Sequence, residues 1–259
     1  MRISNKKLGD VVRYIKNHEH IKISDKIAEF DDLMARISCF KDVGPETKML
    51  EIGTGIGWLL IISKMKGLSC KGIEISPDLV EFGRQLGREN KVEPDIELGN
   101  IEECDIGESA YDVVFALSSF EHVERWQEGL RKVYRALKPG GVFYFTSTNK
   151  FSLSSGEYSF PLYGWLPNSV RYRLRKARQG PDIMELGIDY NQFTYFQLRR
   201  FFRRLGFSRV YDRVDIYQTA GFRRPSVSKR WLLKIAKCSG VLRNLMLLFD
   251  GTTYFICVK

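Results

Sequence analysis

The feature that most constrains the fold is a regular alternation of strand and helix patterns between residues 48 and 146. Short apolar runs of strand length occur at residues 48–52, 70–75, 95–98, 111–116 and 142–146. Segments with the apolar spacing of amphipathic helices lie between them, at residues 58–65, 78–89 and 124–137. Strands joined through helices pair in parallel, and the helices then cover both faces of the sheet. The sequence therefore predicts an α/β fold built on a parallel sheet.

The segments outside this alternation predict a helical cover and an insertion. Residues 5–40 have helical spacing, whereas residues 150–195 are rich in aromatic residues, Ser, Gly and Pro and contain a basic run at 171–178. The patterns that follow predict a helix at 194–205, a strand at 207–217, a basic amphipathic helix at 226–249 and a strand at 253–258. We expect a single domain over residues 1–259. Its parts are an N-terminal helical cover (1–44), a core (45–150), an inserted cap (151–195) and a C-terminal basic part that completes the sheet (196–259).

The positive charge is concentrated in the C-terminal part. The net charge is +10, with about −2 on residues 1–150 and about +12 on residues 151–259. This asymmetry indicates an anionic partner for that part, such as a phosphorylated substrate, an anionic membrane surface or nucleic acid. A solvated basic face without a specific partner is the alternative.

Composition excludes several classes of protein. Apolar residues make up 44% and charged residues 28%, which is ordinary for a globular chain. No uncharged apolar run reaches 18 residues, and the first ten residues lack the apolar segment of a secretory signal. The five cysteines show no CxxC spacing, so we expect a reduced, cytoplasmic chain.

A glycine-rich turn follows the first strand of the alternation. It reads Gly53-Thr54-Gly55-Ile56-Gly57, which is GxGxG rather than the GxGxxG of dinucleotide-binding turns. Glu51 precedes it and would repel a pyrophosphate, but it could hold a cationic amino-acid headgroup. Glu74 ends the second strand, where a carboxylate can accept hydrogen bonds from both ribose hydroxyls. Together these residues fit a nucleoside without phosphates and with an amino-acid tail, namely S-adenosylmethionine.

Four segments carry a family resemblance: MLEIGTGIGWLLI, KGIEIS, YDVVFALSSFEHV and LKPGG. They resemble the successive motifs of class I S-adenosylmethionine-dependent methyltransferases, and within these the type 11 group similar to the quinone-biosynthesis methyltransferases. The resemblance covers residues 45–150, and YNQFTYFQLRRFFRRLGF and TTYFICVK fit the later part of the family more loosely. It implies a Rossmann-like, mostly parallel seven-stranded sheet of order 3-2-1-4-5-7-6 with an antiparallel last strand.

The resemblance also implies which residues bind the cofactor. The glycines would line the methionine side, Glu51 would face its ammonium group, and Glu74 would hold the ribose. Asn100 and Ile101 would flank the adenine, although the family usually has an acid at position 100. The full set is Glu51, Gly53, Thr54, Gly55, Gly57, Glu74, Ile75, Asn100, Ile101, Leu117 and Ser118.

An oxygen acceptor usually has to lose a proton, so we expect a base near the transferred methyl. His122 follows the fourth strand and is the candidate base, with a packing or capping role as the alternative. Asp189, Tyr190 and Gln192 precede the helix at 194–205 and are candidates for lining the acceptor site. No His, Asp or Glu cluster has metal-ligand spacing, so we expect no metal.

The function predicted from the sequence is S-adenosylmethionine-dependent O-methylation of a small or lipid-linked molecule, such as a quinone precursor, a glycan or a lipid intermediate, with S-adenosylhomocysteine as product. The alternatives are an RNA methyltransferase and a non-catalytic S-adenosylmethionine-binding protein. The loop after the fourth strand lacks the motifs typical of nucleic-acid amino- and C5-methylation, so nucleic acid is less favoured as a partner. The basic helical segment at 226–249 predicts either a peripheral membrane contact or ordinary packing on the sheet.

Overall fold

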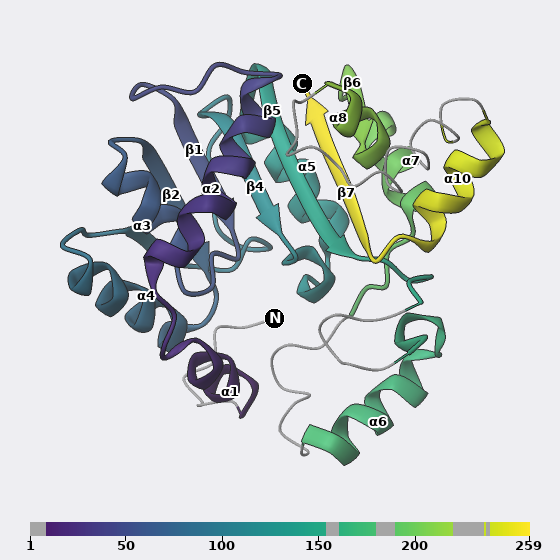
Figure 1. Ribbon diagram of the computed structural model, residues 1–259, viewed down its shortest axis with the longest axis horizontal. Helices are drawn as coiled ribbons and strands as arrows, with labels where there is room; N and C mark the ends of the chain where they lie inside the picture. The colour runs from purple at the N-terminus through teal and green to yellow at the C-terminus, as the bar shows by residue number, and fades with distance from the viewer. Residues whose placement is uncertain (1–8, 154–160, 180–189, 220–235, 237–238) are drawn as a thin grey trace.

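The computed structural model describes residues 9–153, 161–179, 190–219, 236 and 239–259, which form a seven-stranded sheet (Figure 1). The strands are β1 (Lys48–Ile52), β2 (Ser69–Glu74), β3 (Asp95–Leu98), β4 (Tyr111–Leu117), β5 (Leu137–Thr148), β6 (Arg209–Asp212) and β7 (Thr252–Val258). Their order is β3-β2-β1-β4-β5-β7-β6. The first five strands pair in parallel, and β7 runs antiparallel to β5 and β6. The predicted Rossmann-like sheet and its order are confirmed.

Helices cover both faces of this sheet. Those named here are α1 (Gly9–His18), α2 (Ile23–Ser38), α3 (Trp58–Met65), α4 (Pro77–Glu89), α5 (Trp126–Ala136), α6 (Asn168–Gln179), α7 (Tyr195–Leu205), α8 (Arg213–Thr219), α10 (Gly240–Phe249) and the 3₁₀ helices η1 (Phe120–His122) and η2 (Tyr163–Trp165). One buried cluster joins a face of the sheet to α2, α3, α4 and α8, and the other joins the opposite face to α5, α7 and α10.

The central strand β4 shows why the sheet is buried on both sides. Val113 and Phe115 belong to the cluster under α2, α3 and α4, while Val114 and Ala116 belong to the cluster under α5 and α7. Successive side chains of a strand point to opposite faces, so a continuous apolar run fills both layers.

Side-chain hydroxyls cap the beginnings of two of these helices. The Ser76 hydroxyl accepts a hydrogen bond from the Leu79 N–H group (3.3 Å) at the start of α4. The Thr194 hydroxyl accepts from the Gln197 N–H group (3.2 Å) at the start of α7, which ends at Gly206 with a φ of +109°.

One prediction in the C-terminal part was wrong. The strand expected at 207–217 ends at Asp212, because the Asp212 carboxylate accepts from the N–H groups of Val214 and Asp215 and so caps α8. In the helical segment expected at 226–249, residues 240–249 form α10, which is capped by Ser239 with extended backbone. Most of the earlier part of that segment, 226–235 and 237–238, lies outside the described residues.

The cap region begins where β5 ends. Asn149 forms a parallel bridge with Phe193, and the Lys150 N–H group donates to the Phe193 carbonyl (2.7 Å). Between these contacts the chain contributes η2 and α6. Figure 1 shows α1 and α6 on the same side of the molecule, beyond the carboxyl ends of β1 and β4. Among the described helices, none combines the length and apolar character needed to span a bilayer.

Candidate functional site

The glycine loop joins β1 to α3 at the carboxyl edge of the sheet. Gly53, Gly55 and Gly57 have φ values of +71°, +56° and +72°, which side chains other than glycine rarely adopt. A Cβ atom at Gly53 would lie 2.6 Å from the Cβ atom of Ser119. The loop therefore requires glycine, and it brings backbone N–H groups close to the segment that follows β4.

Glu51 is a buried carboxylate directly before this loop. One of its oxygens accepts a hydrogen bond from the Thr54 hydroxyl (2.6 Å), and the side chain is only 2% exposed. The pKa of Glu51 is raised to about 8. Burial is the main cause and the neighbouring charge of Glu74 adds to it, whereas the hydrogen bond from the Thr54 hydroxyl acts in the opposite direction. Such a carboxylate would be stabilised by a cation placed beside it.

Glu74 lies across the loop from Glu51 and is also buried. Its two oxygens accept hydrogen bonds from the N–H groups of Gly55 (2.8 Å) and Ser76 (3.0 Å). Burial raises the pKa of Glu74, while the N–H groups of Ser76, Gly55 and Ile75 and the charge of His122 oppose that rise. A carboxylate has about four acceptor positions, so Glu74 retains capacity for further hydroxyl donors.

The segment after β4 faces the glycine loop. Leu117 ends β4, and Ser118 has a φ of +51°, a left-handed conformation that is uncommon outside glycine. The Ser118 N–H group donates to the carbonyl of Thr146 (3.0 Å). Within the described part of the chain, the buried Ser119 hydroxyl has no hydrogen-bond partner. This hydroxyl lies beside Gly53 and is available to a bound molecule.

His122 ends the short helix η1 and is half-buried. Its charge acts on Glu74 and opposes the rise that burial causes in the pKa of that carboxyl group. The preceding residue, Glu121, is anchored in the other direction. Its carboxylate is fully buried and accepts from the Ser147 hydroxyl (3.0 Å) and the Thr148 N–H group (3.3 Å). Glu121 therefore fixes the turn that carries His122 to strand β5.

Asn100 and Ile101 follow β3, as the sequence analysis expected. The side-chain oxygen of Asn100 accepts from the Glu102 N–H group (3.0 Å), and the Asn100 carbonyl accepts from Glu103 and Cys104. Ile101 is buried in the cluster that faces α5. In this structure the Asn100 oxygen stabilises its own loop, so any contact with a ligand would use its remaining acceptor capacity.

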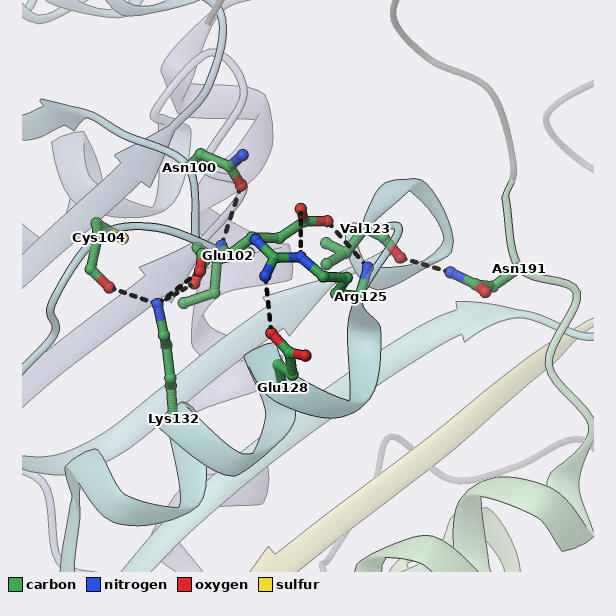
Figure 2. Close-up of polar contacts among 9 residues, drawn as sticks. Asn100, Glu102, Cys104, Val123, Arg125, Glu128, Lys132 and Asn191 are labelled. Atoms are coloured by element: carbon green, nitrogen blue, oxygen red, sulfur yellow. Dashed lines mark hydrogen bonds and ion pairs between the residues drawn. The ribbon is translucent and has the colours of Figure 1, made fainter. Parts of the chain in front are cut away.

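Two basic side chains hold this loop to α5, as Figure 2 shows. The Lys132 ammonium group donates to the carbonyls of Ile101 (3.1 Å), Glu102 (2.9 Å) and Cys104 (2.9 Å). The Glu102 carboxylate accepts from the backbone N–H group of Arg125 (3.0 Å) and from its side-chain Nε (3.5 Å), and the Arg125 guanidinium also pairs with Glu128 (3.0 Å). The loop after β3 is thus held by residues of α5 and of its N-terminal cap.

The predicted acceptor residues divide into three cases. Asp189 lies outside the described residues. Tyr190 is half-buried, and burial raises its pKa, as do the nearby Glu124, Tyr172 and Glu102. Gln192 faces η2, because a Cβ atom at Gly164 would lie 2.8 Å from its side-chain oxygen.

Asn191, which lies between two of the predicted residues, was not predicted from the sequence. Its side-chain amide donates to the carbonyls of Val123 (2.6 Å) and Phe120 (3.3 Å), and its N–H group donates to the Glu121 carbonyl (3.1 Å). Asn191 therefore ties the acceptor segment to the turn that carries His122.

Tyr14 was missed as well. Its hydroxyl lies 3.3 Å from where a Cβ atom of Gly55 would be, so α1 places an aromatic ring over the glycine loop. Helical periodicity in residues 5–40 gave no signal for this contact. The described residues contain no group of three or more His, Cys, Asp or Glu side chains that could hold a metal ion.

Comparison with known proteins adds a family match. Residues 50–145 match the family model described as a methyltransferase domain. Ajmaline N-methyltransferase from Rauvolfia serpentina is 30% identical over 131 residues, which are 47% of this chain and 44% of the relative. Ubiquinone biosynthesis O-methyltransferase from Rickettsia bellii is 25% identical over 139 residues, 51% of this chain and 56% of the relative. The chain thus spans about half the length of the curated relatives it matches.

Solved structures share the fold at low identity. Phosphoethanolamine N-methyltransferase 2 from Haemonchus contortus, in complex with S-adenosyl-L-methionine, aligns with a TM-score of 0.53 and 17% identity, covering 88% of this chain and 52% of that one. An S-adenosylmethionine-dependent methyltransferase from Archaeoglobus fulgidus aligns with a TM-score of 0.55 and 17% identity, covering 95% and 99%. Residues 50–145 thus match a methyltransferase domain, and with its sheet order the chain shares the fold of these S-adenosylmethionine-dependent methyltransferases.

Proposed function

We propose that this protein binds S-adenosylmethionine at the glycine loop and transfers its methyl group to a hydroxyl oxygen of a small or lipid-linked molecule. The observation that carries the proposal is the placement of two buried carboxylates, Glu51 and Glu74, around a loop whose three glycines have positive φ. The family match and the S-adenosylmethionine complex of a structural neighbour support the choice of cofactor.

The residues at the loop fit this cofactor in charge and hydrogen bonding. Glu51, whose pKa is raised to about 8, would gain from a cationic ammonium group. Glu74 has acceptor capacity left for the two ribose hydroxyls. The Ser119 hydroxyl, which has no partner among the described residues, is a further donor beside Gly53. The loops at Asn100–Ile101 and Leu117–Ser118 are the proposed contacts for the remainder of the cofactor.

When bound, S-adenosylmethionine supplies an electrophilic methyl group on a sulfonium sulfur. The protein then has to hold an acceptor in line and remove its hydroxyl proton. We assign proton removal to a ring nitrogen of His122, because η1 holds this half-buried imidazole in the turn after β4, and its charge acts on Glu74. Glu121 supports it by fixing the turn to β5.

The choice of oxygen as acceptor atom rests on His122 rather than on the relatives. These include the ubiquinone biosynthesis O-methyltransferase and the ajmaline N-methyltransferase, so their names do not decide between oxygen and nitrogen. We place the acceptor on the side of Tyr190 and Gln192. A phenolic hydroxyl, as in a quinone precursor, is the first substrate class to test.

Calorimetric titration tests the cofactor assignment. We expect S-adenosylmethionine and S-adenosylhomocysteine to bind and NADH not to bind. Glu74→Ala should weaken binding at least about tenfold, or ~1.4 kcal/mol. The matched control is Glu81→Ala, which removes an exposed carboxylate on α4 that pairs with Arg88. If Glu74→Ala bound S-adenosylmethionine as tightly as the wild type does, Glu74 would not be the residue that holds the ribose.

Methyl transfer from labelled cofactor tests the acceptor class. We expect label to move to phenols or to hydroxyl-bearing lipids from an extract. Cofactor binding without transfer to any acceptor would favour a non-catalytic binding protein. Transfer to RNA, with a steep salt dependence of RNA binding, would favour the nucleic-acid alternative.

A further inference from the structure

We propose that an exposed apolar surface on α10 and η2 docks this protein on an anionic lipid bilayer. Four residues of α10 form the centre of this surface, here called the apolar stripe: Val241, Leu242, Leu245 and Phe249. Their exposed fractions lie between 39% and 70%. At 3.6 residues per turn they fall on one side of the helix. An amphipathic helix normally buries that side.

The opposite side of α10 is held against the protein, and this orientation of the helix leaves the stripe exposed. The Arg243 guanidinium pairs with Asp212 (2.5 Å) and Asp215 (2.7 Å), and Leu247 is buried in the core. The side-chain amide of Asn149 donates to the carbonyls of Leu247, Leu248 and Asp250 at the carboxyl end of the helix. Both the rotation and the end of α10 are therefore determined by polar contacts.

The stripe continues onto η2. The Trp165 ring stacks on Phe249 with centroids 6.0 Å apart, and it is 41% exposed. Leu162, which precedes η2, is exposed and is bonded through its N–H group to the carbonyl of the exposed Leu153 (3.2 Å). Seven of the thirteen large apolar residues that are exposed in the described part of the chain thus lie on this one surface. Clustering of that kind marks an interaction site.

The positive charge of this part of the chain favours an anionic partner. Every acidic residue described after residue 150 is engaged by an arginine, because Asp212 and Asp215 pair with Arg243 and Asp250 pairs with Arg213. Helix α7, which contacts α10, carries the exposed Arg200, Arg203 and Arg204, and helix α6, which follows η2 in the chain, carries the exposed Arg173 and Lys176. An apolar strip with Trp and Phe in this basic part of the chain suits the headgroup region of an anionic bilayer.

A bilayer fits this surface better than a second copy of the chain does. Two copies would bring together parts that each carry about +12 charges in residues 151–259, which opposes association. The surface also lies beside the candidate acceptor segment, because Asn149 contacts α10 on one side and pairs with Phe193 on the other. Docking there would place the acceptor side of the protein next to lipid.

Vesicle co-sedimentation of the full chain tests the proposal without any need for methyl transfer. We expect binding to vesicles of equal phosphatidylcholine and phosphatidylserine, weaker binding in high salt, and little binding to pure phosphatidylcholine. Leu245→Asp and Val241→Asp should each lower the affinity at least about tenfold. The matched control is Met65→Asp on α3, since Met65 is 48% exposed against 45% for Leu245.

Three results would overturn the docking surface. One is equal vesicle binding by both stripe variants and the wild type. Another is a dimer, seen by light scattering, that the stripe variants dissociate, which would make the surface an interface between copies. The third is a large loss of thermal stability in both stripe variants but not in Met65→Asp, which would show that the stripe is packed within the chain. Cofactor titration of the variants separates these results from a failure of the proposed function, because the stripe does not contact the glycine loop.

Discussion

The side-chain amide of Asn191 donates a 2.6 Å hydrogen bond to the carbonyl of Val123, and so joins the segment before α7 to the turn that follows β4. The two residues are 68 positions apart in the chain. The same asparagine also bonds the carbonyls of Phe120 and Glu121. Because His122 lies in that turn, the contact sets the proposed base relative to the proposed acceptor residues Tyr190 and Gln192.

Asn191→Ala should therefore raise KM for the acceptor, by about tenfold, while leaving cofactor affinity unchanged. The physical reason is that two carbonyls lose their donor and the acceptor segment is no longer held to the turn. Steady-state kinetics with a fixed cofactor concentration and cofactor titration measure the two effects. Asn90→Ala is the matched control, because Asn90 also donates to a backbone carbonyl, that of Leu86, but at the end of α4. Equal changes in both variants would indicate only a loss of stability.

Glu51→Gln should make the cofactor-free protein more stable than the wild type, and the difference should grow as pH rises. Folding raises the pKa of Glu51 from 4.5 to about 8, so its contribution to stability is fully present below the ordinary pKa and is lost as pH rises through 8. Glutamine does not ionise, so the variant should be more stable than the wild type by at least ~1.4 kcal/mol near pH 8, the equivalent of one pKa unit. Denaturant unfolding across this pH range measures the difference.

The same substitution should weaken S-adenosylmethionine binding, because the amide carries no charge to hold an ammonium group. Glu46→Gln, at an exposed carboxylate just before β1, serves as the control for both measurements. A stability gain without loss of cofactor affinity would separate Glu51 from the ligand. No gain at pH 8 would mean that its carboxyl group is already compensated in the folded protein.

His122→Asn should lower kcat by about a hundredfold or more, as expected when a general base is removed. Cofactor affinity should change little, because asparagine keeps a polar side chain in the turn and the loop contacts are unaltered. The pH profile of kcat should lose its acidic limb in the variant. His20→Asn, in the turn after α1, is the control and should behave as wild type. A profile that keeps its acidic limb would assign the proton transfer to another group.

Lys132→Met should loosen the loop after β3. The substitution removes three hydrogen bonds to the carbonyls of Ile101, Glu102 and Cys104, while methionine keeps the apolar part of the side chain. Hydrogen bonds to a charged group contribute about 1.5–3 kcal/mol, so a measurable loss of stability is expected. Amide exchange should accelerate in residues 101–105 and cofactor affinity should fall. Lys64→Met on α3 is the control, and equal exchange in the two variants would contradict the role of Lys132.

Local signals made the sheet and the cofactor loop predictable. Apolar runs, helical spacing and the caps at Ser76 and Thr194 act over a few residues, so they can be read along the chain. The glycines of the loop are fixed by their own backbone angles, and Glu51 and Glu74 follow from the ends of two adjacent strands. The strand after residue 207 was overestimated because the cap supplied by Asp212 competes with strand pairing.

By itself, then, the sequence determined the order of the strands, through a family resemblance, and the position of the candidate cofactor site, through local backbone chemistry. Only the tertiary structure decided which distant segments meet: Tyr14 over Gly55, Asn191 on the turn after β4, and Asn149 on the end of α10. The two asparagine contacts are hydrogen bonds and the Tyr14 contact is one of packing, and all three join residues far apart in the chain, for which periodicity carries no signal. The exposure of the apolar stripe was decided in the same way, because the ion pairs of Arg243 and the burial of Leu247 together set which side of α10 faces the protein.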